Sequence, residues 1–456
     1  MEYKLDYEKI SKFVRKKYTY NRREVTYILP LSTRKDRATF PKGFMSVVGG
    51  VVRKINGQNL NIDIRNTGVE DIVDLGNYKS EESKALFSYY LANQLENLNE
   101  GRITSFKQIE LIPFSAIDSE KRGEIDFAIF FFDTFIADDM ERVNNILSKI
   151  DDPNLITDIM ESLSLNLSSS RGRNTDSYKV LFPKLKEQFI SDLESLAQNE
   201  SFFLENISTL FVHYTFVAMS QTILQTNKTT QFDENNLSPV YYILHWEKAG
   251  RWRNSYTQGL SMLKNEIHGF FAHEHALNIL GINTFSDKRN LFYHDIKNKL
   301  EVAGPKAEKQ FIQSIYEWLE VEYKAKTSID VKVYSPTKTL DDAFGDLVSA
   351  VKSGLSKEIN SRYQLAYEAI VSKFFRKHGG SLGTLLSLDQ EQLLLLVAVS
   401  VGNDRIDLKQ LWEEFEQRGV WLDHHSKEEV VQVLDKLNYM EKKSDSGDAQ
   451  YVKSIL

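Results

Sequence analysis

The last seventy residues, 387–456, constrain the fold of this 456-residue chain more than any other stretch. Their apolar periodicity predicts a buried helix at 389–401, a short extended piece at 405–407, a second helix capped by Asp407, and a third helix that opens at Ser426. A Ser/Asp-rich turn then separates two short extended segments. This order of helix, strand, helix, helix and two-stranded wing is the pattern of a winged helix.

The predicted third helix, 426–437, has the wrong charge for a typical DNA-reading helix. It holds two lysines and three acidic residues, and the tip of the wing adds Asp445 and Asp448. Because affinity for DNA comes mostly from neutralised phosphates, we expect this unit either to dock on a protein or simply to close the fold. Trp412 and Trp421 lie in this unit and are candidate partner-binding residues.

Composition favours a soluble, mainly α protein. Hydrophobic residues make up 41% of the chain, and 8 prolines with 22 glycines are too few for a large β-sandwich. The absence of cysteine excludes disulfides, thiol catalysis and cysteine-based zinc sites. The charged start of the chain is unlike a signal peptide, and the longest apolar run, near Leu393, is shorter than the roughly 20 residues that cross a membrane. We therefore expect a cytoplasmic protein without membrane contact.

Positive charge is concentrated at the start of the chain. Residues 1–54 contain 14 Lys and Arg against 5 Asp and Glu, whereas the chain as a whole has a net charge of −7. Tyrosines are interleaved with the basic residues, which is typical of surfaces that bind nucleic acid. A solvated face and an acidic patch on a partner are the alternatives. The candidate DNA-binding residues are Lys12, Arg15, Lys16, Lys17, Arg22, Arg23, Arg34, Lys35 and Arg37.

An extended pattern follows the basic region. Residues 25–29 are predicted to form a strand, and Asn56-Gly57 predicts a turn that joins strands 51–55 and 60–64 in a hairpin. Gly49-Gly50 is read as a bend in a strand, because no phosphate-loop lysine follows it. The expected result is a small N-terminal β-sheet on a helical body.

Two mid-chain groups could carry function. Arginine and tryptophan alternate in a cluster whose members are candidate partner-binding residues: Trp246, Arg251, Trp252 and Arg253. The next helix carries His268, His273, Glu274 and His275, but Leu277 stands where a His-Glu-x-x-His zinc motif needs its second histidine. We therefore expect satisfied or solvated histidines and no metal site there.

Glu124 and Asp126 precede an apolar run and could hold Mg²⁺, which leaves a divergent metal-dependent nuclease as an alternative. However, Phe130–Phe132 follow where such a core usually has a lysine, and polar caps on an apolar element explain the two acids equally well.

The later chain and its linkers complete the predicted organisation. Residues 339–377 are expected to form one long helix or a pair broken near Gly354, with the basic cluster 373–378 at a helix C-terminus. Residues 163–177 are the best linker. The predicted domains are 1–78, a basic region with a small sheet; 79–165, a helical region; 178–380, a helical body; and 387–456, the winged helix.

Several segments resemble the DptG family. They are Trp412–Val420, Leu434–Leu437, Glu441–Lys453, His245–Lys248 and Ile28–Thr33, and their spread suggests that the resemblance covers the whole chain. The resemblance implies a component of a bacterial restriction module tied to DNA phosphorothioation. In such modules one set of proteins places sulfur in the DNA backbone. A second set, including this family with ATPase and helicase-like partners, attacks DNA that lacks the mark.

The sequence contains no Walker A motif, dinucleotide-binding glycine motif, nucleophile elbow or kinase signature, so we expect no catalytic role and no cofactor. The leading hypothesis is a non-catalytic scaffold subunit of a restriction complex in antiviral defence. It would bridge ATPase and helicase-like partners and contact DNA through its basic N-terminal region. A winged-helix DNA-binding transcription regulator is the first alternative, and its acidic third helix argues against it.

Overall fold

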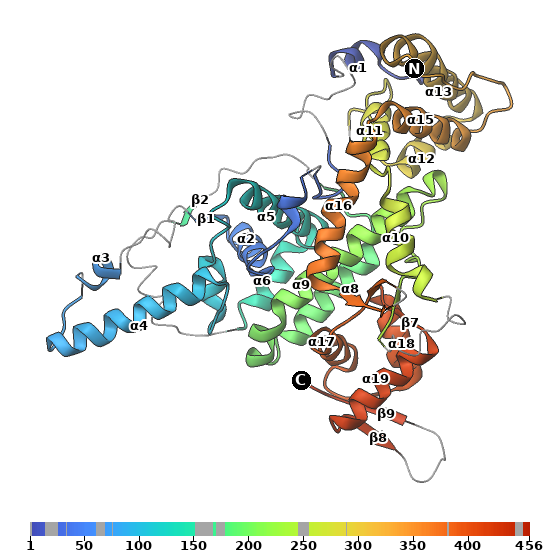
Figure 1. Cartoon of the computed structure of the whole chain (residues 1–456). Coiled ribbons are helices and arrows are strands. Elements are labelled where there is room, and N and C mark those ends of the chain that lie inside the picture. Colours follow the sequence, from blue (N-terminus) through green and yellow to red (C-terminus); the bar gives the residue numbers. More distant parts are fainter. Residues whose placement is uncertain are drawn as a thin grey trace.

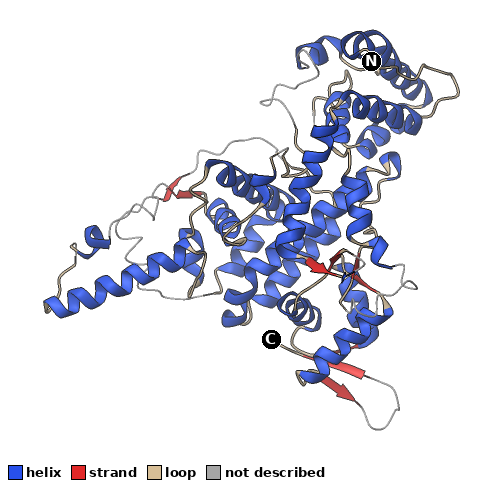
Figure 2. Ribbon diagram, viewed as in Figure 1, coloured by secondary structure: helices blue, strands red, loops and turns tan. Residues whose placement is uncertain are grey.

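The computed structural model describes residues 2–13, 26–32, 34–60, 69–74, 76–150, 167–169, 178–244, 255–288, 290–380, 383–442 and 450–456. Helix makes up 65% and strand 6%, which confirms the prediction of a mainly α protein with small sheets (Figure 2). Most of the buried apolar side chains form one large cluster that extends from Leu5 to Val452, and Ile243 and Leu385 form a second, small one. The four predicted domains remain a prediction.

The described helices run from α1 to α19 along the chain, and α4 projects away from the rest of the molecule (Figure 1). They are α1 (Tyr7–Phe13), α2 (Met45–Ile55), α3 (Val69–Val73), α4 (Glu81–Asn99), α5 (Asp118–Phe131), α6 (Met140–Leu147), α8 (Pro183–Leu196), α9 (Glu200–Thr226), α10 (Leu260–Ile267), α11 (Phe271–Leu280), α12 (Tyr293–Ala303), α13 (Pro305–Trp318), α14 (Lys324–Thr327), α15 (Leu340–Gly354), α16 (Lys357–Phe374), α17 (Gln390–Val401), α18 (Leu408–Gln417) and α19 (His424–Lys436). The short 3₁₀ helix η2 (Lys35–Ala38) precedes α2.

The strands are short and form separate small sheets. They are β1 (Gln58–Leu60), β2 (Leu167–Ser169), β3 (Tyr241–Tyr242), β4 (Arg376–His378), β5 (Thr384–Leu386), β6 (Arg405–Asp407), β7 (Trp421–Leu422), β8 (Met440–Lys442) and β9 (Gln450–Lys453). Antiparallel pairs join β1 to β2 and β4 to β5, a parallel pair joins β3 to β7, and β9 lies between β6 and β8 in an antiparallel sheet.

Helix α9 is the centre of the core. Its apolar residues surround the whole helix, and it packs against α2, α8, α10 and α17. The helix is long and apolar enough to cross a membrane, but 89% of its most apolar window is buried inside the protein. Helix α9, rather than the run near Leu393, is therefore the most membrane-like segment, and burial in the core accounts for its composition.

The predicted N-terminal hairpin is wrong. Residues 51–55 form the last turns of α2, and Gly57 ends that helix with a φ of +64° and an N–H donated to the Lys54 carbonyl. Valine favours strands, but here the valines at 47, 48, 51 and 52 recur with a helical period and are buried. Packing against α5 decides the outcome. Gly49 is needed inside this helix, because a Cβ atom would lie 2.6 Å from the Ile109 carbonyl oxygen.

The predicted strand at 25–29 is also wrong over its described part, Thr26–Leu29. Its backbone bonds to side chains of α11 instead of to another strand. The Thr26 N–H donates to Asn278 Oδ1 at 2.9 Å, and the Ile28 N–H donates to Glu274 Oε2 at 3.4 Å. Side chains of a helix thus take the place of a β partner for this segment.

In the C-terminal unit, residues 387–456, two of three predicted helix starts are close to the structure. Asp389 caps α17, and Asp407 caps α18 by accepting a bond from the Gln410 N–H at 2.9 Å. Helix α19 begins at His424 and not at Ser426, because Asp423 is its cap. His424 and His425 both belong to the first turn of this helix.

The expected helix pair at 339–377 is confirmed as α15 and α16, with the break after Gly354. The basic cluster that follows is placed differently from the prediction. Helix α16 ends at Phe374, and Arg376–His378 form the exposed strand β4. A favourable interaction with the helix dipole therefore accounts only for Lys373, the basic residue in the last turn.

A buried ion pair joins the C-terminal unit to the helical body. Arg418, which follows α18 and is 2% exposed, donates from Nη2 to Asp192 Oδ1 at 2.6 Å and from Nε to Asp192 Oδ2 at 2.8 Å. The Tyr214 hydroxyl donates to the same carboxylate at 2.5 Å, and His213 Nε2 bonds to the Arg418 carbonyl oxygen at 2.9 Å. Helices α8, α9 and α18 therefore meet at one guanidinium group.

Protonation states in this network follow from burial and charge. Burial alone would lower the pKa of Arg418, but Asp192 and its neighbours outweigh that effect and raise it. Burial lowers the pKa of His213 to about 4, so the ring is neutral at neutral pH and its Nε2–H donates to the Arg418 carbonyl. The Arg418 guanidinium consequently stays charged, and its hydrogen-bonding positions are well occupied.

Replacing Arg418 tests this attachment. We expect Arg418→Met to lower the free energy of unfolding by about 3 to 5 kcal/mol, because it leaves the Asp192 carboxylate buried without its cation. Arg418→Lys keeps the charge but cannot make the two-point bond, so its effect should be smaller. Urea denaturation measures both values. The control is Lys409→Met, whose side chain is 88% exposed on α18. An Arg418→Met variant as stable as this control would contradict the assignment.

Candidate functional site

The strongest candidate site is a groove of about 470 Å³ on the C-terminal unit, between α18, α19 and β9. We call it the Trp412 groove. Its lining residues are Leu408, Trp412, His424, Lys427, Glu428, Val431, Gln432 and Gln450. The groove combines the apolar side chains of Leu408, Trp412 and Val431 with polar and charged ones, as protein-binding surfaces do.

Helical spacing explains how this groove forms. On α18, Leu411 and Phe415 are buried in the core, while Leu408 and Trp412 stand one turn apart and remain partly exposed. On α19, Val430 is buried and Val431 is partly exposed. Each helix thus contributes the edge of its apolar face to the groove instead of the centre.

Charges hold the groove walls in place. The Lys427 ammonium lies 5.4 Å from the centre of the Trp412 ring, which joins α19 to α18 by a cation–π contact. Glu428 accepts ion pairs from His424 at 3.2 Å and His425 at 3.0 Å when those rings are protonated. The whole unit carries 14 acidic against 8 basic residues, so the surroundings of the groove are acidic.

The structure separates the two predicted partner-binding tryptophans of this unit. Trp412 lines the groove, whereas Trp421 lies on β7, pairs with Tyr241 of β3, and donates its backbone N–H to the Val240 carbonyl at 3.1 Å. Trp421 thus helps to attach the unit to the preceding chain. The other candidates of this set, Trp246, Arg251, Trp252 and Arg253, lie outside the described residues.

The structure describes only some of the candidate DNA-binding residues. Arg15, Lys16, Lys17, Arg22 and Arg23 lie outside the described residues. Lys12 is exposed near the end of α1, a helix held on α13 by the Tyr7 hydroxyl, which donates to the Ser314 carbonyl at 2.9 Å. The remaining three residues lie elsewhere, on or beside η2, which packs against α5 and α16.

These three residues of the η2 segment differ in exposure. Arg34 and Lys35 are exposed, but the Arg37 side chain is only 18% exposed and lies 3.8 Å from Asp126. Burial raises the pKa of Asp126 to about 6, although Arg37 pulls it in the opposite direction. Arg37 therefore faces a carboxylate of α5, and the two exposed cations are the ones available to a ligand.

A glycine of α5 provides the contact surface for η2. The backbone of Arg37 crosses α5 at Gly123 so closely that a Cβ atom there would lie 1.9 Å from the Arg37 carbonyl oxygen. Neighbouring Glu124 is buried and accepts a bond from the Ser115 N–H at 2.6 Å. Glu124 and Asp126, the acids of the nuclease alternative, thus lie on a helix and each faces a partner from another segment.

The predicted histidines lie in different surroundings: His273 and His275 are buried in α11, whereas His268 is exposed at the C-terminal end of α10. His273 Nδ1 bonds to the Tyr293 hydroxyl at 3.0 Å, and His268 Nδ1 bonds to Gln364 at 3.2 Å, as expected for satisfied histidines. Burial lowers the pKa of His273 to about 4 and that of His275 to about 3. No set of three side chains suited to hold a metal occurs in the part of the chain that the structure describes.

Glu274 is the most perturbed acid of this interior. It is 2% exposed and accepts bonds from the Ile28 N–H at 3.4 Å and the Tyr363 hydroxyl at 3.3 Å. Burial raises the pKa of Glu274 to about 8, and the two donors only partly oppose this effect. Glu274 with Asn278 thus anchors the segment that leads into η2.

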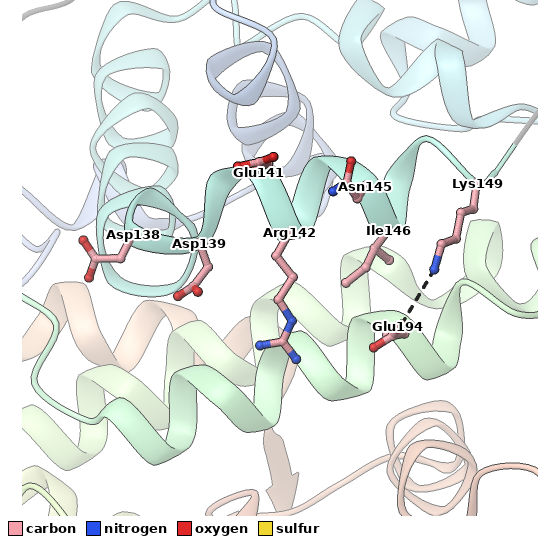
Figure 3. A pocket seen from close by; sticks show the side chains of 8 residues that line it. All are labelled: Asp138, Asp139, Glu141, Arg142, Asn145, Ile146, Lys149 and Glu194. Carbon is pink, nitrogen blue, oxygen red and sulfur yellow. Dashed lines mark ion pairs between the residues drawn. The ribbon is translucent and has the colours of Figure 1, made fainter.

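A second groove, of about 440 Å³, lies between α6 and α8 (Figure 3). Its charged side chains pair with one another or with close neighbours: Lys149 with Glu194 at 3.8 Å, and Arg142 with Glu187 at 2.8 Å. Asp139 accepts a bond from Lys186 at 2.5 Å. These pairs join the two helices, so the groove is better explained as an electrostatic contact between them than as a ligand site.

No protein-family model matches the chain, and no curated protein matches its sequence. Sequence patterns had marked Trp412 but not its neighbours Leu408, Lys427 and Val431. The i, i+4 spacing of Leu408 and Trp412 was visible, but it indicated a core face. Only the packing of α18 on α19 shows that this edge remains accessible.

Substitution of Gly123 tests the contact with η2. We expect Gly123→Ala to destabilise the protein by about 1 to 3 kcal/mol, because the added methyl group must displace the Arg37 backbone. The matched control is Gly345→Ala in α15, where the Cβ atom meets open space. That variant should be stabilised by about 0.5 to 1 kcal/mol. Thermal or urea unfolding compares them, and equal effects would refute the close contact.

The raised pKa of Glu274 predicts that the free energy of unfolding depends on pH. The folded protein holds this proton up to about pH 8, whereas the unfolded chain releases it near 4.5. The free energy of unfolding should therefore fall as pH rises through this window, and the protein loses stability at the alkaline side. Glu274→Gln removes this loss. Urea unfolding at about pH 5 and about pH 8 should show the variant gaining relative to wild type at the higher pH. A constant difference would contradict the raised pKa.

Proposed function

We propose that this protein is a non-catalytic subunit of a bacterial phosphorothioation-dependent DNA restriction complex. In that role it bridges ATPase and helicase-like partners in the cytoplasm. The observation that carries the proposal is the Trp412 groove, an accessible tryptophan flanked by apolar and charged side chains on an acidic unit. Segments that resemble the DptG family, including Trp412–Val420 itself, supply the identity of the complex.

The C-terminal unit is proposed to be a winged helix. The order α17, β6, α18, α19, β8 and β9 supports this assignment, as does the placement of β9 between β6 and β8. Ile406 of β6 lies opposite Val452, and Val452 lies opposite Met440 of β8. The residues at the tip of the wing, 443–449, lie outside the described residues.

Charge favours a protein partner over DNA for this winged helix. Lys427, the basic residue of α19 that lines the groove, lies against the Trp412 ring, and Glu428 is its direct neighbour in the chain. A phosphate backbone would meet the acidic excess of the unit. An aromatic anchor in a partly apolar groove, in contrast, is the feature that binding hot spots share. The transcription-regulator alternative gains no support from this surface.

The proposed DNA contact rests on the basic N-terminal region. Arg34 and Lys35 are exposed on the η2 segment, and Lys12 is exposed on α1. These cations suit phosphate binding, which is sequence-independent and sensitive to salt. In a scaffold, such contacts would position DNA while the partner subunits act on it.

Association with partner subunits tests the proposal. We expect the purified chain to bind an ATPase subunit of the same restriction system, and Trp412→Ala to weaken that binding at least tenfold, since a buried aromatic anchor contributes about 1.4 kcal/mol or more. Isothermal titration calorimetry or biolayer interferometry measures the change. Leu365→Ala, at an exposed leucine of α16, is the matched control. The proposal fails if wild type binds neither partner, or if both variants bind as wild type does.

A further inference from the structure

A short basic ribbon lies at the end of α16. It consists of Lys373, Arg376, Lys377 and His378, all of them exposed. The sequence from 369 to 388 contains no aspartate or glutamate, and Glu368 and Asp389 flank this stretch.

Buried contacts of Phe375 and pairing of β4 with β5 hold the ribbon in place. Phe375 lies between its basic residues, is 1% exposed, and stacks on Phe216 of the central helix α9 with ring centres 4.3 Å apart. Strand β4 pairs with β5, whose Leu385 and Leu386 are buried. The Ser387 N–H donates to the Phe375 carbonyl at 2.8 Å. The cations are therefore presented from an ordered strand, which reduces the entropy lost on binding a ligand.

The cations of the ribbon form no ion pair with the part of the chain that the structure describes. Across the described ranges, no carboxylate lies within ion-pair distance of Lys373, Arg376 or Lys377. Lys373 donates to the Pro41 carbonyl at 3.3 Å, and Arg376 donates to His378 Nε2 at 2.5 Å. Neither partner is a carboxylate, so these bonds orient the side chains without forming an ion pair.

The ribbon adjoins the η2 segment. The Lys373–Pro41 bond and the Phe40–Phe374 ring contact at 6.1 Å place residues 40–41 against the end of α16. Helix η2, with Lys35, packs against the same helix. The exposed cations of the two elements thus belong to neighbouring parts of one surface. Arg34 and Lys35 come from the first tenth of the chain, and the ribbon comes from its last fifth.

The chemistry of this surface fits a phosphate backbone better than an acidic protein. Protein interfaces have an apolar centre, but none of the described large hydrophobic side chains between 369 and 388 is exposed. Binding of a nucleic-acid backbone requires cations and hydrogen-bond donors at spaced positions and no apolar centre. An extended strand separates successive side chains by about 3.3 Å along its axis and points them alternately to opposite faces. The basic residues of β4 therefore lie at regularly spaced positions along this strand.

We propose that the ribbon of Lys373, Arg376, Lys377 and His378 binds the phosphodiester backbone of DNA. This inference goes beyond the proposed function, because it assigns a second DNA contact far in sequence from the basic N-terminus and does not depend on the partner subunits. We expect this contact to be independent of base sequence, because contacts to phosphates carry no sequence information directly.

The test is a salt titration of the purified full-length chain binding a short random-sequence DNA, duplex or single-stranded, followed by fluorescence anisotropy. Arg376→Gln/Lys377→Gln should weaken binding and reduce the slope of log K against log salt by about 2, one for each phosphate that the variant no longer neutralises. Lys373→Gln alone should reduce it by about 1. The control is Lys306→Gln/Lys309→Gln, two exposed lysines on α13.

Several results would overturn the proposal. These are no binding of wild type to either form of DNA, an unchanged slope in the ribbon variants, an equal reduction in the α13 control, or ribbon-dependent binding to anionic lipid vesicles instead of DNA. Unfolding curves of the variants that match wild type exclude a loss of structure as the cause. Association with the ATPase subunit is measured in parallel. Ribbon-dependent DNA binding without that association would retain this inference and reject the scaffold role.

Discussion

The ion pair between Arg418 and Asp192 is the interaction on which the placement of the C-terminal unit, residues 387–456, against α8 and α9 depends. Taking a guanidinium and a carboxylate out of water costs several kcal/mol for each ion, and this cost is offset only if almost every hydrogen-bonding position is used. Tyr214 and Glu414 supply the additional bonds that a simple pair would lack. Because the network admits little displacement, the C-terminal unit has a fixed orientation on α8 and α9. The Trp412 groove is therefore presented in one direction.

The same central helix links this network to the other attachment points. Gln221 of α9 accepts a bond from the Ser238 N–H at 2.7 Å, and Gln225 donates to the Asn236 carbonyl at 3.1 Å. These bonds hold the segment that continues into β3. There the Leu244 N–H donates to the buried Ser426 hydroxyl at 3.1 Å, which lies in the first turn of α19. The polar side chains of an otherwise apolar helix thus determine where the C-terminal unit attaches, while its apolar side chains provide cohesion.

Local signals in the sequence predicted the parts of the fold that local chemistry decides. The sequence predicts Asp407 as a cap, because a short acidic side chain before an apolar period can satisfy the first N–H groups of a helix, and it predicts the start of the preceding helix at Asp389. The valines of α2 were misassigned, since their strand preference is overridden by packing on α5, which no local pattern reveals. Ser426 was taken for a cap because its hydroxyl suits one, but that hydroxyl bonds to a segment almost two hundred residues earlier. Arg418 and Asp192, 226 residues apart, carried no local signal at all. The same limit explains why Trp412 could be named without the rest of its groove.

The distribution of charge over the surface follows from these attachments. The C-terminal unit carries an acidic excess, whereas exposed cations gather on the η2 segment and at the end of α16. Both α16 and the C-terminal unit contact the helical body that contains α9, so the basic and acidic surfaces belong to one rigid framework. A nucleic acid attracted to the basic surface would be repelled by the acidic unit. The two surfaces adjoin, because the Ser387 N–H donates to the Phe375 carbonyl at 2.8 Å and Gln392 Nε2 donates to the Phe374 carbonyl at 2.8 Å. The change from basic to acidic surface therefore lies where β5 leads into α17, at the end of α16.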